Sequence, residues 1–306
     1  MPRFTVLLPV HRPPALLPFA IETVLAQEVD DFELFVICDG APAETAACAR
    51  DYARRDKRVR VFTFAKGERH GEAYRHQALT QAGGELVAQI ADDDLWLPNH
   101  LGELSALLAE ADFGHTIHTI VDPGGAVQPY LGDLARPELR ARMLIEPFNF
   151  FGPSAAGYRL AAYRRLETGW SPAPADVWTD LHMWRKFLCR DDLVFATRMM
   201  ITTLSFPAPQ RADMTLAARA EELRAWSSRL AEPGERATVI EAAWRRLMRD
   251  ALDGEAALAE MTAAHAELAD AHRRILASRS WRTTAPLRTA AGKMRRLARA
   301  LTTGRG

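Results

Sequence analysis

The first 110 residues alternate short apolar runs with longer stretches of helical pattern, and this alternation constrains the fold more than any other feature of the chain. Strand-like runs are predicted at Phe4–Val10, Glu33–Cys38, Val59–Phe64 and Leu86–Ala91. The stretches between them have the length and spacing of helices, and they are Ala15–Gln27, Ala43–Lys57 and Gly71–Gly83. Strand, helix and strand repeated at this spacing predict parallel strands joined by right-handed crossovers. We therefore expect an α/β fold of the nucleotide-binding type, with a mostly parallel sheet flanked by helices.

Length and composition are those of a globular protein. The 306 residues, of which 48% are hydrophobic, suffice for one large domain or for one domain with an appendage. No stretch approaches the roughly 20 apolar residues of a membrane span, and the N-terminal residues lead into a strand without a signal-peptide pattern. The three cysteines have unrelated spacings, which predict neither a disulfide framework nor a zinc site. A cytoplasmic location is expected.

Three consecutive aspartates, Asp92, Asp93 and Asp94, follow the fourth strand-like run. The carboxyl ends of parallel strands form the edge of the sheet where α/β proteins bind ligands. Carboxylate oxygens suit Mg²⁺ or Mn²⁺, and a metal held by one or two of them keeps positions for phosphate oxygens. A metal-bridged diphosphate is the first hypothesis. The alternative is a solvated turn that caps a helix beginning near Pro98, although a cap requires one aspartate rather than three.

Glycine-rich phosphate-binding loops are missing from this pattern. Neither GxGxxG nor GxxxxGK[ST] follows any of the strand-like runs, so a metal is expected to hold the phosphates. The first run leads into a proline-rich loop at Pro9–Pro13, which should lie beside Asp39 at the end of the second run. Asp39 and Gly40 are also ordinary turn residues, and this reading stays open.

These segments resemble, in the same order, the inverting nucleotide-sugar glycosyltransferases of family 2, which have the GT-A fold. FTVLLPVHRP resembles the opening strand and loop of that family, ELFVICDG its second strand, and GEAYRHQALTQAGGELVAQIADDDLWLPNHL the segment that contains its metal motif. The resemblance extends from about Phe4 to Leu104. It implies metal-dependent transfer of a sugar, with inversion, from a UDP-sugar to an acceptor hydroxyl in bacterial surface polysaccharide or glycan synthesis. A GT-A protein that binds a nucleotide sugar without transferring it is the alternative.

The resemblance also implies roles for individual residues. The residues that match its nucleotide-binding positions are Pro9, Arg12, Asp39, Arg75, Asp92 and Asp93. Among them, Asp39 would accept a hydrogen bond from the nucleobase. Asp92 and Asp94 would be the outer members of the metal motif for Mn²⁺ or Mg²⁺, with Asp94 as the expected direct ligand. Two positions depart from the family pattern: His11 replaces a Tyr-Asn pair, and His76 replaces the Asn that follows the Arg matched by Arg75.

The second half of such an enzyme must supply a carboxylate base within hydrogen-bond reach of the acceptor hydroxyl. Asp180 is the candidate for this catalytic base. It precedes an amphipathic helix, and its segment resembles the family's Glu-Asp motif with Thr179 in the Glu position. A helix cap formed by Thr179 or Asp180 is the alternative, and both readings remain open. The aromatic residues of Pro147–Leu166 match the family's acceptor segment, where they could stack on a sugar or form core.

From Asp213 onward the pattern is helical, with breaks predicted at Pro233–Gly234 and Gly254. We therefore expect a glycosyltransferase domain at 1–212, comprising a donor half (1–110) and an acceptor and catalytic half (111–212), followed by a helical extension at 213–306. Within 255–277, the residues at alternating spacings of three and four are Leu258, Met261, His265, Leu268, His272 and Ile275. This seam predicts either a short coiled coil in a homodimer or a helix packed against the body.

Charge is distributed unevenly although the net charge is zero. Residues 271–306 contain ten Lys and Arg and no acidic residue. The tail at 278–306 begins with SRSWRTTAPLR, which resembles a segment found after bacterial glycosyltransferase domains. A basic, apolar helix suits peripheral contact with anionic lipid at the inner face of the plasma membrane, and a solvated tail is the alternative. No nucleic-acid-binding module is recognisable, so the expected partners are a nucleotide-sugar donor and a saccharide or lipid-linked acceptor.

Overall fold

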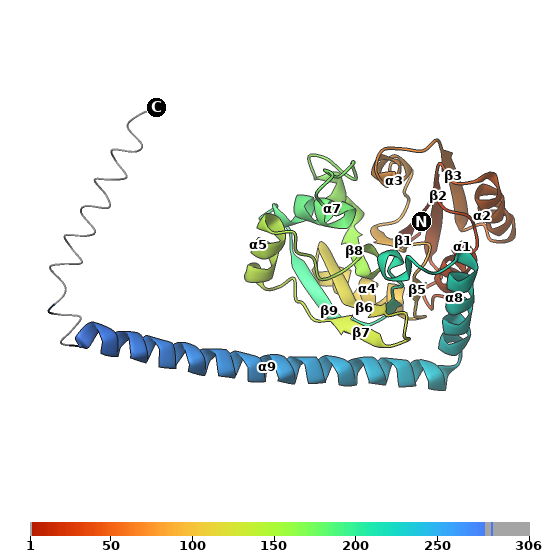
Figure 1. Ribbon diagram of the computed structural model, residues 1–306. Coiled ribbons are helices and arrows are strands. Elements are labelled where there is room, and N and C mark those ends of the chain that lie inside the picture. Colours follow the sequence, from red (N-terminus) through yellow and green to blue (C-terminus); the bar gives the residue numbers. More distant parts are fainter. Residues whose placement is uncertain (1, 279–282, 284–306) are drawn as a thin grey trace, which may run out of the picture. The chain divides into compact units, whose positions relative to one another are not determined.

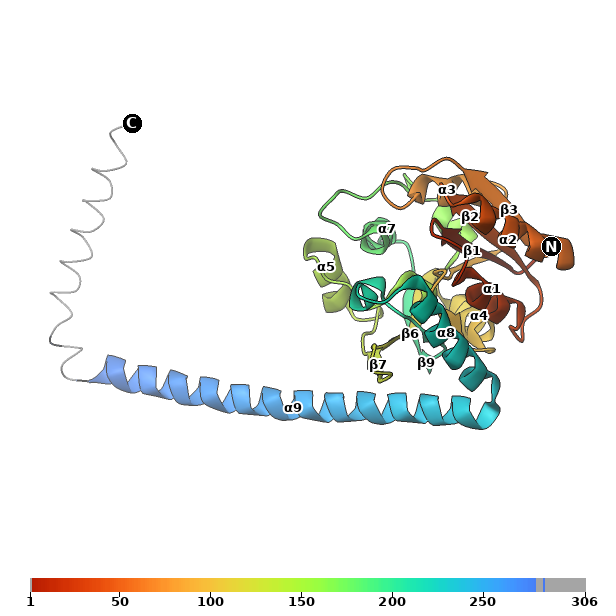
Figure 2. The ribbon, with the colours of Figure 1, turned by 45° about the vertical axis from the view of Figure 1, so that its right-hand side comes forward.

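The computed structural model describes residues 2–278 and residue 283 (Figure 1). The chain divides after Leu247 into two compact units. An eight-stranded sheet with helices on both faces forms the first unit (Figures 1 and 2). The expected α/β class with a sheet flanked by helices is confirmed.

The strands of the sheet lie in the order β3-β2-β1-β4-β8-β6-β7, with β9 beside β6. Their bounds are β1 Phe4–Val10, β2 Phe32–Asp39, β3 Val59–Phe64, β4 Leu86–Gln89, β6 Phe113–Val121, β7 Val127–Tyr130, β8 Ala156–Arg159 and β9 Phe195–Ile201. The first four strands are parallel to one another, whereas β8 runs antiparallel to β4 and β6. The four predicted strands of the N-terminal half are confirmed, with shifts of one or two residues at their ends.

Side chains of the central strands alternate between the two faces, as the twofold period of a strand requires. In β1, Val6 and Leu8 pack into the core on one side and Leu7 into the core on the other. The first core is covered by α1 (Leu17–Leu25), α2 (Ala43–Arg55) and α4 (His100–Glu110). The second is covered by α3 (Glu72–Leu79), α5 (Pro137–Ile145), α6 (Leu160–Arg164) and α7 (Thr179–Leu188).

A small two-stranded sheet lies beside the main one and is formed by β5 (Leu95–Trp96) and β10 (Thr203–Leu204). Short 3₁₀ helices, η1 (Pro153–Ala155) and η2 (Ala208–Arg211), precede β8 and follow β10. The pairing of β5 with β10 brings residues after Leu204 next to the acidic triplet.

The helical region after residue 212 begins inside the first unit. Helix α8 (Leu216–Ala231) buries Leu223, Trp226 and Leu230 against Leu95 and other core residues. The first unit thus continues to Leu247, beyond the predicted boundary at 212. The helical pattern indicated an apolar face but carried no information about the surface that the face covers.

Helix α9 (Pro233–Ala277) follows directly after α8. The predicted break at Pro233–Gly234 is confirmed, because one helix ends at Ala231 and the next begins at Pro233. The predicted break at Gly254 is wrong, since α9 continues through it; a helical glycine costs only about 1 kcal/mol relative to alanine. No helix in the described part of the chain is long and apolar enough to cross a membrane. The predicted basic tail lies outside the described residues, apart from Ser278 and Thr283.

Candidate active site

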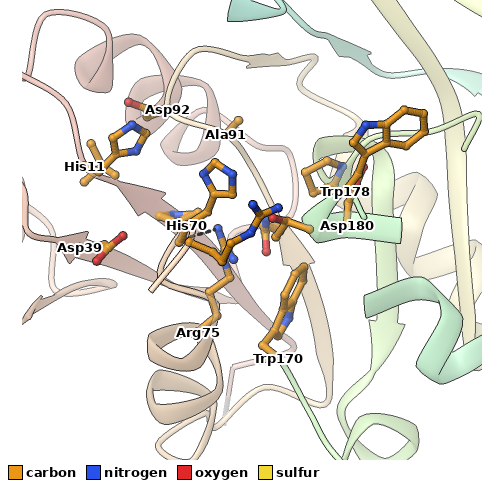
Figure 3. A pocket seen from close by; sticks show the side chains of 15 residues that line it. His11, Asp39, His70, Arg75, Ala91, Asp92, Trp170, Trp178 and Asp180 are labelled. Carbon is orange, nitrogen blue, oxygen red and sulfur yellow. Dashed lines mark hydrogen bonds between the residues drawn. The ribbon is translucent and has the colours of Figure 1, made fainter. Parts of the chain in front are cut away.

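A cavity of about 430 Å³ opens at the carboxyl ends of β1, β2 and β4 (Figure 3). Its walls combine residues that follow these strands with residues from the loop before α3 and from the start of α7. The lining residues are Pro9, Val10, His11, Asp39, Arg69, His70, Arg75, Gln89, Ala91, Asp92, Pro153, Trp170, Trp178, Thr179 and Asp180. The predicted residues Pro9, Asp39, Arg75, Asp92 and Asp180 therefore meet in one cavity, whereas Arg12, Asp93 and Asp94 lie behind its wall.

Asp39, the last residue of β2, is a buried hydrogen-bond acceptor in the wall of this cavity. One carboxylate oxygen accepts a hydrogen bond from the Gly67 amide at 2.6 Å, and the other contacts the Lys66 ammonium group. Gly71 has a φ of 66°, and a Cβ there would lie 2.5 Å from Asp39 Cγ. Only glycine therefore allows the loop before α3 to pass this close to Asp39. Asp39 is therefore more than a turn residue, because its carboxylate holds the loop before α3 through its contacts with Gly67 and Lys66.

Arg75 is a buried cation with unused donors. Its guanidinium group lies over the Trp170 ring, 4.9 Å from the centroid, and its Nη2 donates to the His70 carbonyl at 3.2 Å. Its Nε and Nη1 are buried without a hydrogen-bond partner. Burial lowers the pKa of Arg75 to about 10, which leaves it charged at neutral pH. Because buried polar groups are nearly always paired, these donors fit an anionic or polar ligand in the cavity.

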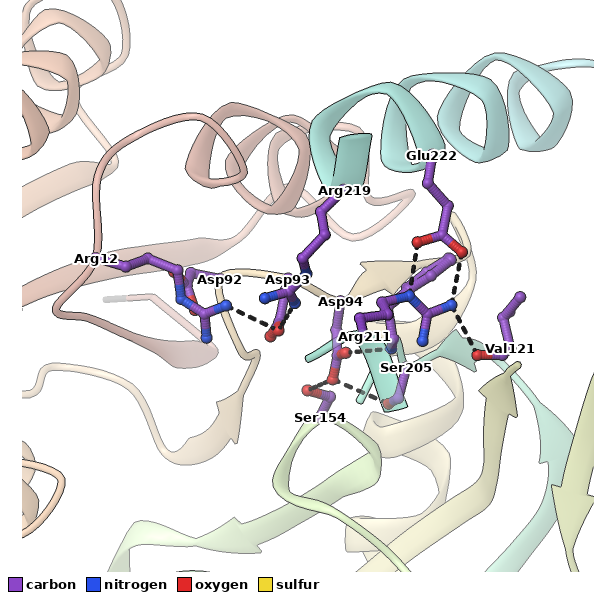
Figure 4. A network of polar contacts seen from close by, with 11 residues as sticks. Arg12, Asp92, Asp93, Asp94, Val121, Ser154, Ser205, Arg211, Arg219 and Glu222 are labelled. Carbon is purple, nitrogen blue, oxygen red and sulfur yellow. Dashed lines mark hydrogen bonds and ion pairs between the residues drawn. The ribbon is translucent and has the colours of Figure 1, made fainter. Parts of the chain in front are cut away.

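The acidic triplet is divided among three environments (Figure 4). Asp94 points away from the cavity and is satisfied by the protein itself. Its Oδ2 accepts from the hydroxyls of Ser154 at 2.5 Å and Ser205 at 2.9 Å, and its Oδ1 accepts from the Phe206 amide at 3.0 Å. The Asp94 carboxylate thereby joins β10 and η1 to the end of β4.

Asp93 is held between two arginines. Its Oδ2 accepts from Arg12 at 3.1 Å and from Arg219 of α8 at 2.5 Å. Asp92 faces the cavity, and its Oδ2 lies 3.0 Å from Arg12 Nε without the alignment of a hydrogen bond. Burial, and then the neighbouring charge of Asp93, raise the pKa of Asp92 and of Asp94. Arginine side chains thus supply part of the positive charge that the triplet requires.

The alternative of a helix cap is wrong for the triplet. Helix α4 begins at His100, and its N-cap residue Asn99 makes no side-chain cap. None of the three aspartates accepts a hydrogen bond from the first turn of α4 in the described structure. Their carboxylates are used for tertiary contacts instead.

Asp92 is the member of the triplet that fits a metal ion. It lines the cavity, and its Oδ2, which forms an ion pair with Arg12, accepts no hydrogen bond. Among residues 2–278, there is no group of three or more His, Cys, Asp or Glu side chains that could hold a metal ion. Mg²⁺ and Mn²⁺ sites of nucleotide-binding enzymes need only one or two carboxylates when phosphate oxygens complete the shell. The prediction of Asp92 and Asp94 as ligands stays a prediction, and the geometry favours Asp92.

Asp180 lies in the first turn of α7, across the cavity from Asp92. Its Oδ1 accepts from the Leu181 amide at 2.8 Å and its Oδ2 from Asn149 Nδ2 at 2.9 Å. Burial raises the pKa of Asp180 to about 6, while the hydrogen bonds from Leu181 and Asn149 act in the opposite direction. A carboxylate with a pKa near the working pH is suited to accept a proton. The preceding residue, Thr179, makes no cap and donates its hydroxyl to Glu72 at 2.9 Å.

A second cavity, of about 590 Å³, shares Asp180 and Trp178 with the first. The other lining residues are His118, Ile120, Tyr130, Asn149, Phe150, Phe151, Gly152, Pro207, Pro209 and Gln210. Trp178 is 53% exposed, so its ring is accessible where the two cavities meet. Phe150 and Phe151 are buried core residues. The aromatic segment predicted to serve either core or sugar stacking thus contributes mainly to the core, with Phe150 and Phe151 also forming a cavity wall.

Several residues of this region were not predicted from the sequence. His70 and Trp170 line the first cavity, and Arg219 reaches Asp93 from a helix that the predicted boundary assigned to the extension. No local pattern marks them. Arg219 and Asp93 are 126 positions apart, so only the tertiary fold brings them together.

Comparison with known proteins places this chain in a family. The model of the family described as Glycosyl transferase family 2 matches residues 5–166, which is more than half of the chain. The chain belongs to glycosyl transferase family 2. This match includes β1, β2, the loop before α3 and the acidic triplet, and it ends before Asp180.

Curated relatives of this family 2 chain are bacterial proteins. The GalNAc(5)-diNAcBac-PP-undecaprenol beta-1,3-glucosyltransferase of Campylobacter jejuni is 29% identical over 115 residues, which are 38% of this chain and 36% of the relative. The O-antigen biosynthesis glycosyltransferase WbnJ of Escherichia coli is 30% identical over 98 residues, or 32% and 38% of the two chains. The succinoglycan biosynthesis protein ExoW of Rhizobium meliloti is 28% identical over 152 residues, or 48% and 47%. The match to the first of these spans little more than a third of that relative's length.

Solved structures confirm the GT-A fold. The crystal structure of S. aureus TarS 1-349 has a TM-score of 0.55 at 15% identity, with 74% of this chain and 71% of that chain covered. The same protein in complex with UDP-GlcNAc has a TM-score of 0.53 at 18% identity, with 67% and 58% covered. These similarities concern the fold of the family 2 chain.

Proposed function

We propose that this protein transfers a sugar from a nucleoside diphosphate sugar to an acceptor hydroxyl, with Asp180 as the general base. The observation that carries this proposal is the position of Asp180 on the wall shared by two cavities. One cavity contains the residues suited to a nucleotide diphosphate, and the other has room for an acceptor. A carboxylate between them can accept the proton of an acceptor hydroxyl as that oxygen attacks the sugar.

The donor fits the first cavity by charge and by hydrogen bonding. Asp39 lines this cavity, and in this proposal it accepts a hydrogen bond from the nucleobase. Arg75 presents two unpaired donors, which suit a sugar hydroxyl or a diphosphate oxygen. UDP is the first candidate nucleotide, from the family resemblance and because TarS has this fold and has been crystallised with UDP-GlcNAc. dTDP and GDP are the alternatives.

The transfer step itself is a single displacement at the anomeric carbon. The acceptor oxygen forms a bond to that carbon, its proton moves to a carboxylate oxygen of Asp180, and the bond to the diphosphate breaks. Attack opposite to the leaving group inverts the anomeric configuration. Asn149 orients the Asp180 carboxylate through its 2.9 Å hydrogen bond, so that the base needs little rearrangement before the reaction.

A divalent cation, Mn²⁺ or Mg²⁺, fits beside Asp92 in the donor cavity. When bound, it would neutralise the negative charge that develops on the leaving diphosphate. Arg12 and Arg219 hold Asp93 behind the wall, and Asp94 is held by serine hydroxyls. In this proposal, Asp92 contacts the metal, and the other two aspartates hold the end of β4 in place.

The biological setting proposed is bacterial surface polysaccharide or glycan synthesis. Relatives named for O-antigen and succinoglycan biosynthesis, and a glucosyltransferase named for an undecaprenol-linked glycan, support this proposal. The acceptor would be a saccharide, either free or linked to lipid. The second cavity, with Tyr130 and Trp178 at its wall, has the aromatic character that suits a sugar ring.

Thermal unfolding of the protein with UDP, dTDP, GDP and CDP, each with and without Mn²⁺, tests donor binding. A ligand at 100 times its dissociation constant stabilises the fold by roughly 2.7 kcal/mol. Asp180→Asn is expected to keep that stabilisation and to lower turnover by about 10²- to 10⁴-fold. Asp176→Asn, an exposed aspartate of the same loop, is the matched control and should turn over normally. Unchanged turnover of Asp180→Asn would remove Asp180 as the base.

A further inference from the structure

One buried carboxylate beside the active site has no role in the mechanism above. Glu72 is the first residue of α3, and its side chain is 0% exposed. Its Oε1 accepts a hydrogen bond from the Thr179 hydroxyl at 2.9 Å, and its Oε2 accepts from the His70 amide at 3.0 Å. In the described part of the chain, no Lys, Arg or His nitrogen lies close enough to Glu72 for an ion pair.

Both hydrogen-bond partners of Glu72 belong to the active site. Thr179 immediately precedes Asp180 at the start of α7, and it lines the donor cavity. His70 lines the same cavity, and its carbonyl accepts from Arg75. Glu72 thus connects the segment that carries the base to the segment that carries the buried arginine.

Electrostatics adds a third connection. The negative charge of Glu72 is the largest charge contribution that raises the pKa of Arg75 against its burial. A buried carboxylate that lacks an ion pair is costly, and a neutral side chain would normally be tolerated better. In this position the Glu72 carboxylate stabilises the charged form of Arg75 and accepts the hydrogen bond of the Thr179 hydroxyl.

The loop that Glu72 holds has an unusual backbone. Arg69 has a φ of 50° and Gly71 a φ of 66°, so residues on both sides of His70 adopt the left-handed conformation. Such a conformation costs energy for a residue other than glycine and needs surrounding contacts to persist. The hydrogen bonds from the His70 amide to Glu72 and from Arg75 to the His70 carbonyl provide those contacts.

We propose that Glu72 is a positioning residue that sets the distance between the base Asp180 and the ligand-binding Arg75. It acts on Asp180 through Thr179 and on Arg75 through His70 and through its charge. This inference rests on the proposed function. It predicts two separable effects, because the Thr179 contact concerns the base and the His70 contact concerns the donor.

The test uses the intact protein with UDP-glucose, UDP-N-acetylglucosamine and GDP-mannose as the probes. The measured quantity is the rate at which nucleoside diphosphate is released. Thr179→Val removes the hydroxyl, and we expect kcat to fall 10- to 100-fold with donor KM within twofold, since small displacements of a catalytic group have effects of this size. Thr179→Ser keeps the hydroxyl and should restore kcat. Glu72→Gln disturbs both contacts and should lower kcat and also raise donor KM at least fivefold.

The chain contains a matched control for the loss of such a hydrogen bond. Thr5 donates to Glu33 at 2.7 Å, and Glu33 also accepts from the Gly83 amide at 2.6 Å. As at Glu72, a threonine hydroxyl and a backbone amide donate to one glutamate, although here both donate to the same oxygen, and the pair lies at the opposite end of the strands. Thr5→Val should lower the midpoint of thermal unfolding while leaving kcat and KM unchanged.

A double-mutant cycle separates positioning from general stability. Glu72→Gln and Thr179→Val should be non-additive in kcat, because each breaks the same contact. Thr179→Val with wild-type kcat, in a protein whose Asp180→Asn variant is inactive, would overturn the role of Glu72 and leave the proposed function intact. Equal turnover of wild type and Asp180→Asn would overturn the proposed function and this inference with it. If Glu72→Gln does not fold, the difference in kcat between Thr179→Val and Thr179→Ser is sufficient to test the role of Glu72.

Discussion

Asp92 and Asp94 are two residues apart, yet their surroundings give them different tasks. Asp92 lines the donor cavity, and its Oδ2 forms an ion pair with Arg12 without accepting a hydrogen bond, whereas both oxygens of Asp94 accept hydrogen bonds within the protein. A carboxylate that is already satisfied gains little from a metal ion, and one that is not satisfied gains much. The identity of the residue is therefore a poor guide to its role in this triplet. The role of each aspartate depends on the hydrogen bonds that its carboxylate accepts.

This difference predicts opposite effects of two equivalent substitutions. Asp92→Asn should abolish the Mn²⁺-dependent part of nucleotide binding and destabilise the fold less than Asp94→Asn, because the Asp92 Oδ2 accepts no hydrogen bond from the protein. Asp94→Asn replaces a buried acceptor by an NH₂ group that faces hydroxyl or amide donors, which should cost roughly 1–3 kcal/mol of stability. Urea unfolding and titration calorimetry with UDP and Mn²⁺ measure the two effects. The reverse pattern would identify Asp94 as the metal ligand.

The pH dependence of turnover follows from Asp180. Burial raises its pKa to about 6, and only the ionised carboxylate can accept a proton. Turnover should therefore fall as the pH decreases through about 6, rather than through the ordinary range of an aspartate near 4. Asn149 donates a hydrogen bond that favours the ionised form, so Asn149→Leu should move this acid limb to higher pH. A pH–kcat profile for both proteins checks the sign, and an acid limb that stays in place or moves down would contradict it.

Much of the cavity could be predicted at the residue scale, because its position depends on strand ends. Asp39 and Asp92 follow strands that are recognisable from their apolar runs, and parallel strands bring such ends to one edge. The orientation of the triplet could not be predicted. Asp94 meets Ser154 and Ser205, which are 60 and 111 positions away, and Asp93 meets Arg219 at 126 positions. No local sequence pattern encodes contacts over such separations.

At the scale of elements, α8 is the least expected part of the site. Its apolar face packs on the core beside β5 and β10, and this packing directs Arg219 toward Asp93. The strand and helix order of the first 110 residues was predictable from periodicity. The antiparallel insertion of β8 between β4 and β6 was not, since strand order depends on pairing between distant segments.

Arg219→Gln tests whether α8 supports the donor site. The Arg219 and Asp93 side chains are only 11% and 10% exposed, so loss of this charged hydrogen bond should cost about 1.5–3 kcal/mol of stability. It should also weaken nucleotide binding, because Arg12 would be left as the one arginine that contacts Asp93 in the described structure. Arg224→Gln, on the same helix and paired with the exposed Glu221, is the control and should change stability by less than about 0.5 kcal/mol. Equal effects of both substitutions, by urea unfolding and calorimetry, would argue against a role for Arg219.

At the scale of the whole molecule, the two units differ in how they are stabilised. The first has continuous cores on both faces of its sheet. The second contains the later part of α9, where Leu258, Met261 and Leu268 are 64%, 70% and 68% exposed. Apolar residues at this spacing on a long helix are typical of a coiled-coil seam. The sequence predicted this seam, but periodicity cannot determine whether a partner covers it.

We expect a second copy of the chain to cover the seam, because three exposed apolar side chains along one stripe are unfavourable in a lone helix. Full-length protein should then be a dimer in light scattering, and Leu258→Lys with Leu268→Lys should convert it to a monomer. Glu260→Lys, at an exposed position outside the seam, should leave the dimer unchanged. Nucleotide binding should persist in the monomer, since every residue of the donor cavity belongs to the first unit. A wild-type monomer would contradict the coiled coil, and loss of nucleotide binding on monomerisation would show that the donor site depends on the second unit.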